Sequence, residues 1–181
     1  MVIDPKVENS ARDLIGHAVR GELDELAGLL AALDPERRIE CLVLCLRISG
    51  YIAIDICGHI WPTDADVREM AGEISTADLN FKLSEADAYA FLRRAALGFE
   101  PIFDVFPEKD KAVAVPIFAT AALLTSYRRE PQHWWEYLDV IEQALEQAAP
   151  LPKETVPAVL LWSRINHAVE TGRSGERTAG A

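Results

Sequence analysis

The chain has 181 residues, of which 50% are hydrophobic and 26% are charged, and its formal net charge is −11. This composition is typical of one soluble globular domain and excludes disordered, collagen-like and disulfide-rich chains. The acidic excess disfavours nucleic acid and anionic membranes as partners, because both attract proteins with clustered basic residues. We therefore expect no nucleic acid and no membrane among its partners.

The cysteines and the N-terminus predict a cytoplasmic location. Three cysteines cannot all pair with one another, and residues 1–8 carry acidic residues where a secretory signal would need a basic region and an apolar stretch. A reducing compartment is therefore expected. The preference for Arg over Lys and the many Ala residues suggest a GC-rich bacterial genome.

The first part of the chain predicts two amphipathic helices. Apolar residues recur at helical spacing over residues 4–20 and again over residues 23–33, with Gly21 between the two stretches. The first stretch places five apolar residues on one face: Val7, Ala11, Leu14, Ile15 and Ala18. A helical hairpin is the expected result.

A long central helix is predicted next. Asp34 followed by Pro35 is a helix start signal, because Asp caps the first turn and proline is tolerated at the first helical position. Apolar residues then continue at helical spacing, and Trp61-Pro62 is taken as the stop. The helix is therefore expected over residues 35–60, at the centre of the fold.

Two shorter helices follow. Thr63, or alternatively Thr76, and Ser84 are each followed by acidic residues, the pattern of N-caps with negative charge in the first turn. The helices are expected near residues 64–75 and 84–98.

The later part of the chain is also expected to be helical. After a Phe-rich loop over residues 101–107, an apolar helix runs to about Arg129, and Pro116 either kinks it or lies near its start. A short strand over residues 113–115 is the alternative, because these residues alternate weakly.

The remaining helices complete an all-α domain. They are predicted over residues 131–147 and 152–171, and the small, polar residues 172–181 are expected to form a disordered tail. The sequence thus predicts one all-α domain over residues 1–171, a bundle of seven or eight helices packed around the long helix at about 35–60.

A narrow polar stripe on the long helix is the first candidate site. At about 100° per residue, four polar residues fall within about 120° of one another on an otherwise apolar helix: Arg47, Tyr51, Asp55 and His59. A buried Asp must be paired, so Asp55 is expected to interact with Tyr51 and His59. The stripe could bind a small anionic ligand or act as an acid–base pair. Alternatively, it only sets the register of the helix.

The cysteines do not predict a metal site. Cys41 and Cys45 lie one turn apart, but Cys57 is rotated by about 120° from Cys45 on the same helix, so three thiolates cannot converge on one ion. Buried free cysteine behaves instead as a small apolar residue. We predict reduced cysteines and no bound metal.

Other catalytic patterns are missing from the sequence. Glu69 and Glu73 lie one turn apart, but the chain lacks the pair of Glu-x-x-His motifs that dinuclear carboxylate bundles use. It also lacks a Gly-rich phosphate loop and a Gly-x-Ser-x-Gly elbow. We therefore expect no cofactor, and a protein that is not an enzyme.

Adjacent tryptophans provide the second candidate site. Trp134 continues an apolar stripe and is expected in the core, whereas Trp135 falls on the acidic face of Glu142 and Glu146. An exposed Trp above an acidic face is typical of an interface anchor. Alternatively, Trp135 packs under the Phe-rich residues 99–106.

Two functional hypotheses follow. The leading one is a non-enzymatic protein–protein interaction module that self-associates, with a second copy or another protein as its partner. The alternative is a small-ligand-binding protein or enzyme that uses the polar stripe in a cleft of the core. A pocket beside Asp55 would favour the second, and an apolar surface around Trp135 would favour the first.

Overall fold

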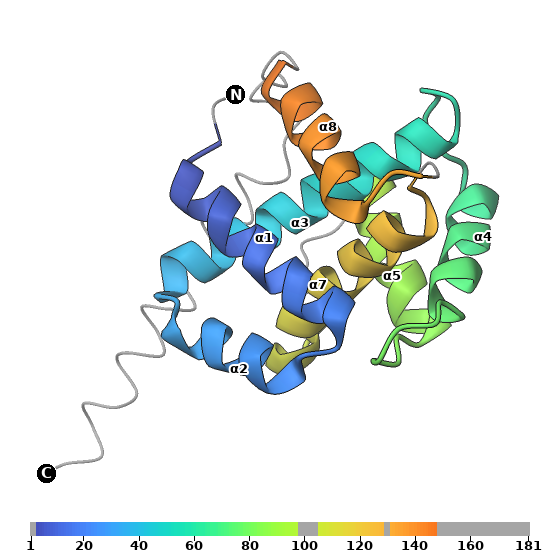
Figure 1. Cartoon of the computed structure of the whole chain (residues 1–181). Helices are drawn as coiled ribbons and strands as arrows, with labels where there is room; N and C mark the ends of the chain where they lie inside the picture. Colours follow the sequence, from blue (N-terminus) through green and yellow to red (C-terminus); the bar gives the residue numbers. More distant parts are fainter. Residues whose placement is uncertain (1–2, 98–104, 129–130, 148–181) are drawn as a thin grey trace, which may run out of the picture.

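The structure, a computed structural model, describes residues 3–97, 105–128 and 131–147. Within these ranges it is all-α, with seven helices and no strand, which confirms the predicted fold class (Figure 1). The helices are α1 (Pro5–Arg20), α2 (Leu23–Ala32), α3 (Pro35–Ile56), α4 (Asp64–Ser75), α5 (Glu85–Leu97), α7 (Lys109–Ser126) and α8 (Trp134–Gln147). The helix predicted at 152–171 and the tail predicted at 172–181 lie outside the described residues.

Two helices share the centre of the bundle. α3 packs against α1, α5, α7 and α8. α7 packs against α1, α3, α4, α5 and α8. α4 and α5 form an antiparallel pair on one side, and α1 and α2 lie on the other (Figure 1). The long helix is central as predicted, but α7 is equally so, because almost every side chain from Val115 to Leu124 is buried.

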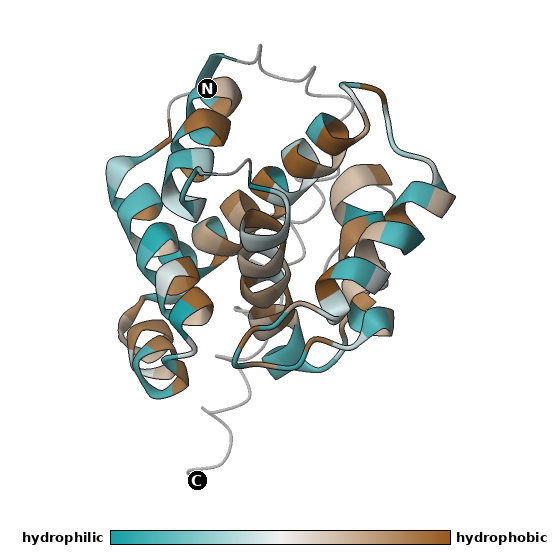
Figure 2. Cartoon of the chain, turned by 45° about the vertical axis from the view of Figure 1, so that its right-hand side comes forward, coloured by the Kyte–Doolittle hydropathy of each residue, from teal (hydrophilic) through white to brown (hydrophobic). Residues whose placement is uncertain are grey.

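Hydrophobic residues gather toward the inside of the bundle, and hydrophilic residues predominate on the outer sides of the helices (Figure 2). Burial of these apolar faces is the main source of stability for such a fold. Among the described helices, none combines enough length with enough apolar character to cross a bilayer.

A small polar cluster lies where α3 crosses α7. The hydroxyl groups of Ser49 and Thr120 are 2.9 Å apart and both side chains are fully buried. The Thr120 hydroxyl also lies 2.6 Å from the carbonyl oxygen of Pro116 and 3.2 Å from that of Cys45. Pro116 is therefore inside α7, and residues 113–115 are helical rather than a strand. The buried hydroxyls are satisfied within the core.

The helical spacing of the sequence predicts a buried face on α3, formed by Leu42, Leu46, Ile52, Ala53 and Ile56, and this prediction is only partly correct. Leu42, Ile52 and Ala53 are buried, but Leu46 is only half-buried and Ile56 is 37% exposed. Ile56 is exposed because α3 ends there, at the surface of the bundle. Truncation of Leu46 is therefore expected to cost less than loss of a fully buried leucine.

The predicted N-caps of α4 and α5 are confirmed. The Thr63 hydroxyl accepts a hydrogen bond from the Asp66 backbone N–H at 3.3 Å, and the Asp66 carboxylate accepts one from the Thr63 N–H at 2.7 Å. This reciprocal pair is a capping box. Ser84 likewise accepts from the N–H of Asp87 at 3.1 Å. The alternative cap Thr76 instead lies at the C-terminal end of α4.

Candidate functional site

A left-handed turn ends α3 earlier than predicted. The N–H of Gly58 donates to the carbonyl of Asp55 at 3.0 Å, and the N–H of His59 donates to that of Ile54 at 2.9 Å. Gly58 and His59 have positive φ angles of 69° and 64°. This pair of hydrogen bonds is the usual way in which a glycine ends a helix. Gly58 was thus the sequence signal for the helix end, and His59 lies on the turn rather than on the helix.

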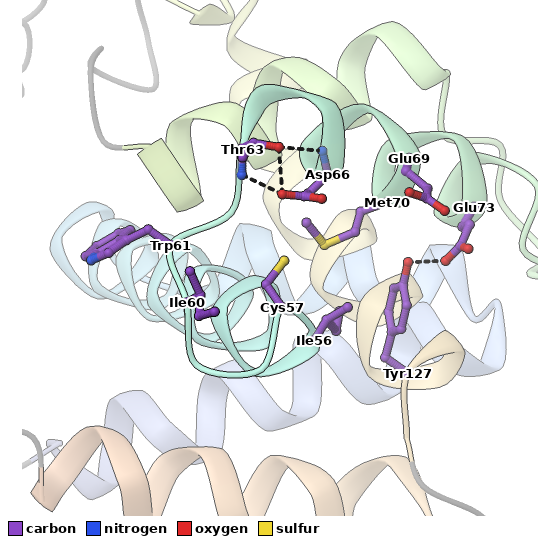
Figure 3. Close-up of a pocket in the computed structure, with 10 residues that line it drawn as sticks. All are labelled: Ile56, Cys57, Ile60, Trp61, Thr63, Asp66, Glu69, Met70, Glu73 and Tyr127. Carbon is purple, nitrogen blue, oxygen red and sulfur yellow. Dashed lines mark hydrogen bonds between the residues drawn. The ribbon is translucent and has the colours of Figure 1, made fainter.

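A pocket of 420 Å³ lies beside this turn (Figure 3). We call it the α3–α4 pocket, because it lies between the last residues of α3, the loop that follows and one face of α4, with Tyr127 from the end of α7 closing one side. The turn at Gly58 and the capping box at Thr63 hold the two ends of the loop. Ile60 and Trp61 therefore project from a short loop that is fixed at both ends.

Apolar side chains form the floor and one end of the α3–α4 pocket. Ile60 is 70% exposed and Trp61 is 69% exposed, while Met70, which also lines the pocket, is buried. The side chains of Met70 and Cys57 point toward one another across the floor, with Trp61 at one end of the pocket and Tyr127 at the other (Figure 3). Exposed apolar residues gathered around a concavity are typical of a binding surface.

Three carboxylates of α4 form the edge of the α3–α4 pocket. They recur at helical spacing along one side: Asp66, Glu69 and Glu73. Hydrogen bonds from Thr63 lower the pKa of Asp66, which favours its charged form. The hydroxyl of Tyr127 donates to Glu73, and burial raises the pKa of Tyr127, which keeps this donor protonated.

The charge of the pocket favours positively charged ligands. Lys, Arg and His are all missing from the described residues that line it. The C-terminal end of α3 also faces the pocket and contributes a partial negative charge. A ligand with an apolar body and a positive charge would contact both the floor and the carboxylate edge.

The thiols show no catalytic activation. Burial raises the pKa of Cys57, which lines the α3–α4 pocket, and so disfavours the nucleophilic thiolate. Burial also raises the pKa of Cys41 to about 11 and that of Cys45 to about 12. Within the described ranges, we find no group of three or more His, Cys, Asp or Glu residues that could hold a metal ion. The absence of a bound metal stays a prediction.

The polar stripe is only partly assembled, and its members lie outside the α3–α4 pocket. Asp55 accepts a hydrogen bond from the hydroxyl of Tyr137 in α8 at 3.0 Å, a partner that sequence spacing did not suggest. His59 Nε2 lies 3.8 Å from Asp55 Oδ1, but the His59 side chain is 73% exposed. Arg47 and Tyr51 are half-buried. Ligand binding by the stripe stays a prediction.

Trp135 lies at the surface, as the interface hypothesis requires. It is 45% exposed, and its ring stacks on that of His133 with the ring centres 4.2 Å apart. Trp134 is half-buried and meets Trp135 edge to face, with ring centres 5.8 Å apart. Most residues of the predicted covering loop, 99–106, lie outside the described ranges. The stacked rings of His133 and Trp135 thus lie together at the surface, at the start of α8.

The pairs of acids along helices, such as Glu142 and Glu146, are expected from the sequence to form solvated faces, and for Glu142 this expectation is wrong. Glu142 is only 5% exposed, because Arg12 of α1 lies over it and pairs with both Glu142 and Asp139, the latter at 2.5 Å. Burial raises the pKa of Glu142 to about 7. Glu146 accepts a hydrogen bond from the backbone N–H of Ile3 at 3.3 Å. Glu142 is thus covered by Arg12, whereas Asp139 and Glu146 stay exposed.

Comparison with protein-family models, with curated proteins and with solved structures finds no match to this chain. The geometry of the described residues is therefore the basis on which a function can be argued.

Proposed function

We propose that the protein is an interaction module whose α3–α4 pocket holds a positively charged, amphipathic helical segment of a partner protein. One observation carries the proposal. Ile60 and Trp61 are about two-thirds exposed on a loop whose ends are both hydrogen-bonded, at one end of the pocket whose edge carries the three carboxylates of α4. An amphipathic helix bound in a groove places apolar anchors in the floor and its polar residues at the rim.

The chemistry of the pocket supports binding rather than catalysis. Its acidic groups lie along one edge, where they can pair with basic side chains and select against acidic partners. Its thiol is not activated, and its tyrosine is held by Glu73. The same charge disfavours phosphate-bearing ligands such as nucleic acid.

Replacement of Trp61 by alanine should weaken binding of a synthetic amphipathic helix of Leu and Lys about tenfold, because an aromatic anchor at the centre of an interface contributes 1.4 kcal/mol or more. Glu69→Gln combined with Glu73→Gln should also weaken binding, and should reduce its dependence on salt, because fewer charges are then screened. Fluorescence anisotropy of the labelled peptide measures both effects.

Trp135→Ala is the matched control for Trp61→Ala, since it removes another exposed tryptophan that does not line the pocket. It should leave the dissociation constant for the peptide unchanged. Equal loss of affinity in both variants, or no binding of the peptide to any form of the protein, would contradict the proposed function.

Self-association through Trp135 is a second candidate, favoured by its exposure and by its stacking on His133. Two-fold dimers are the commonest oligomers, and a tryptophan anchor at such an interface is expected to raise affinity about tenfold or more. Sedimentation should therefore show a dimer that Trp135→Ala dissociates and Trp61→Ala does not. A monomeric wild type would rule this candidate out.

A further inference from the structure

The residues that follow α8 combine an apolar run with a net positive charge, the two properties that the α3–α4 pocket favours in a ligand. We call residues 148–181 the C-terminal segment. It contains nine successive residues without charge, 155–163, which include Val159, Leu160, Leu161 and Trp162. Four basic residues against three acidic ones give the segment a net charge of +1, in a chain whose total is −11. It is thus a positively charged part of an acidic protein, and it contains an apolar run.

We infer that the C-terminal segment is the first occupant of the α3–α4 pocket, and that a partner protein must displace it. This inference rests on the proposed function, since it assigns the same pocket to a segment of the same chain. The helical spacing predicted for residues 152–171 places Leu161 and Ile165 on one face, with Arg164 at its edge. Such a face matches an apolar floor beside a row of carboxylates.

The chain is long enough for this contact. Tyr137 of α8 touches Asp55, which directly precedes the pocket residues of α3. From Tyr137 to the end of α8 the helix advances about 15 Å. Residues 148–155 can span up to about 28 Å when extended, so the apolar run can return to the pocket.

Because the C-terminal segment is covalently attached to the bundle, even a weak affinity for the α3–α4 pocket is enough to keep it bound. A tethered ligand acts at an effective concentration of about 1 mM, so a contact of modest affinity is occupied in most molecules. Burying Ile60 and Trp61 in this way would also remove from water the large apolar surface that the described residues leave exposed. The pocket would open only to a partner that binds it more tightly than the C-terminal segment does.

Cys57 provides a natural reporter, because it lines the pocket while Cys41 and Cys45 are buried in the core. The rate of Cys57 alkylation by a maleimide is measured by peptide mapping in the full chain. If the segment covers the pocket in about nine of ten molecules, Leu161→Asp should speed alkylation of Cys57 about tenfold. Ala179→Asp, which adds the same charge outside the apolar run, should have no effect.

Arg164→Glu is a second variant that changes only the charge beside the apolar face, and it should also speed alkylation. Cys41 and Cys45 must stay unreactive, which shows that the bundle is folded. An unchanged rate at Cys57 in both tail variants would overturn the inference. Protection that disappears on dilution would overturn it as well, because the segment of a second copy would then be the occupant.

Failure of this inference and failure of the proposed function are distinguishable. If the Leu-Lys peptide binds wild type and Leu161→Asp with equal affinity at the α3–α4 pocket, the function stands and the inference fails. If the inference holds, Leu161→Asp should bind the peptide more tightly than wild type does, since the competing segment no longer covers the pocket. If the peptide binds neither form, the proposed function fails whatever the alkylation rates show.

Discussion

Gly50→Ala should lower the free energy of unfolding by about 1–3 kcal/mol, although alanine favours helices by about 1 kcal/mol over glycine. Gly50 is buried where α3 packs against α5, and a side chain there would place its Cβ 2.7 Å from the carbonyl oxygen of Ala95. That oxygen belongs to the backbone of α5, so relief of the clash requires the two helices to separate. Urea unfolding measures the loss.

Gly28→Ala is the matched control, because Gly28 is also a helical glycine, but a Cβ added there would meet no other part of the protein within 4 Å beyond the adjoining backbone of its own helix. It lies in α2, at the surface. This variant should be more stable than wild type by about 0.5–1 kcal/mol, through helix propensity alone. A gain of stability in both variants would show that α3 and α5 are not in close contact at Gly50.

Stability should fall as the pH rises from about 4.5 to 7, because burial raises the pKa of Glu142 to about 7 from an ordinary value of 4.5. In this range the folded protein keeps a proton on Glu142 that the unfolded chain has released, so unfolding becomes more favourable with increasing pH. The contribution is expected to be about 1–3 kcal/mol at neutral pH. Asp66 acts in the opposite direction and at lower pH, since hydrogen bonds from Thr63 lower its pKa.

Glu142→Gln should remove this fall, because the amide has nearly the same shape as the protonated acid and does not titrate. Arg12 would keep Glu8 and Asp139 as its partners in that variant. The measurement is the free energy of unfolding in urea at a series of pH values. Glu146→Gln, an exposed acid of the same helix, serves as the control and should retain the slope of wild type. The same slope in Glu142→Gln would mean that another group causes it.

Helix starts could be predicted from the sequence because their causes are local. Asp34 and Pro35 begin α3, and Thr63 and Ser84 cap α4 and α5 through residues three positions along the chain. Such hydrogen bonds form within a single turn, so neighbouring residues decide them. The end of α3 was also encoded locally, in Gly58, but the more conspicuous Trp61-Pro62 pair pointed to a later position.

The candidate site could not be predicted in the same way. The α3–α4 pocket depends on Tyr127 reaching Glu73, which is 54 residues away in the chain. Its apolar end depends on Ile60 and Trp61 staying uncovered by the described residues. Whether a bulky apolar residue is buried depends on which helices pack over it, and a pattern along the chain does not state this.

The sequence by itself determined the helical class, most helix starts and the acidic charge, because each follows from residue types at short spacing. Only the tertiary structure decided that Arg12 covers Glu142, 130 residues away in the chain, that Asp55 meets Tyr137 in α8, and that α7 shares the centre with α3. These outcomes depend on how helix faces pack together across the bundle. Packing is governed by shape and burial at long separation, where the periodicity of a single helix carries no information.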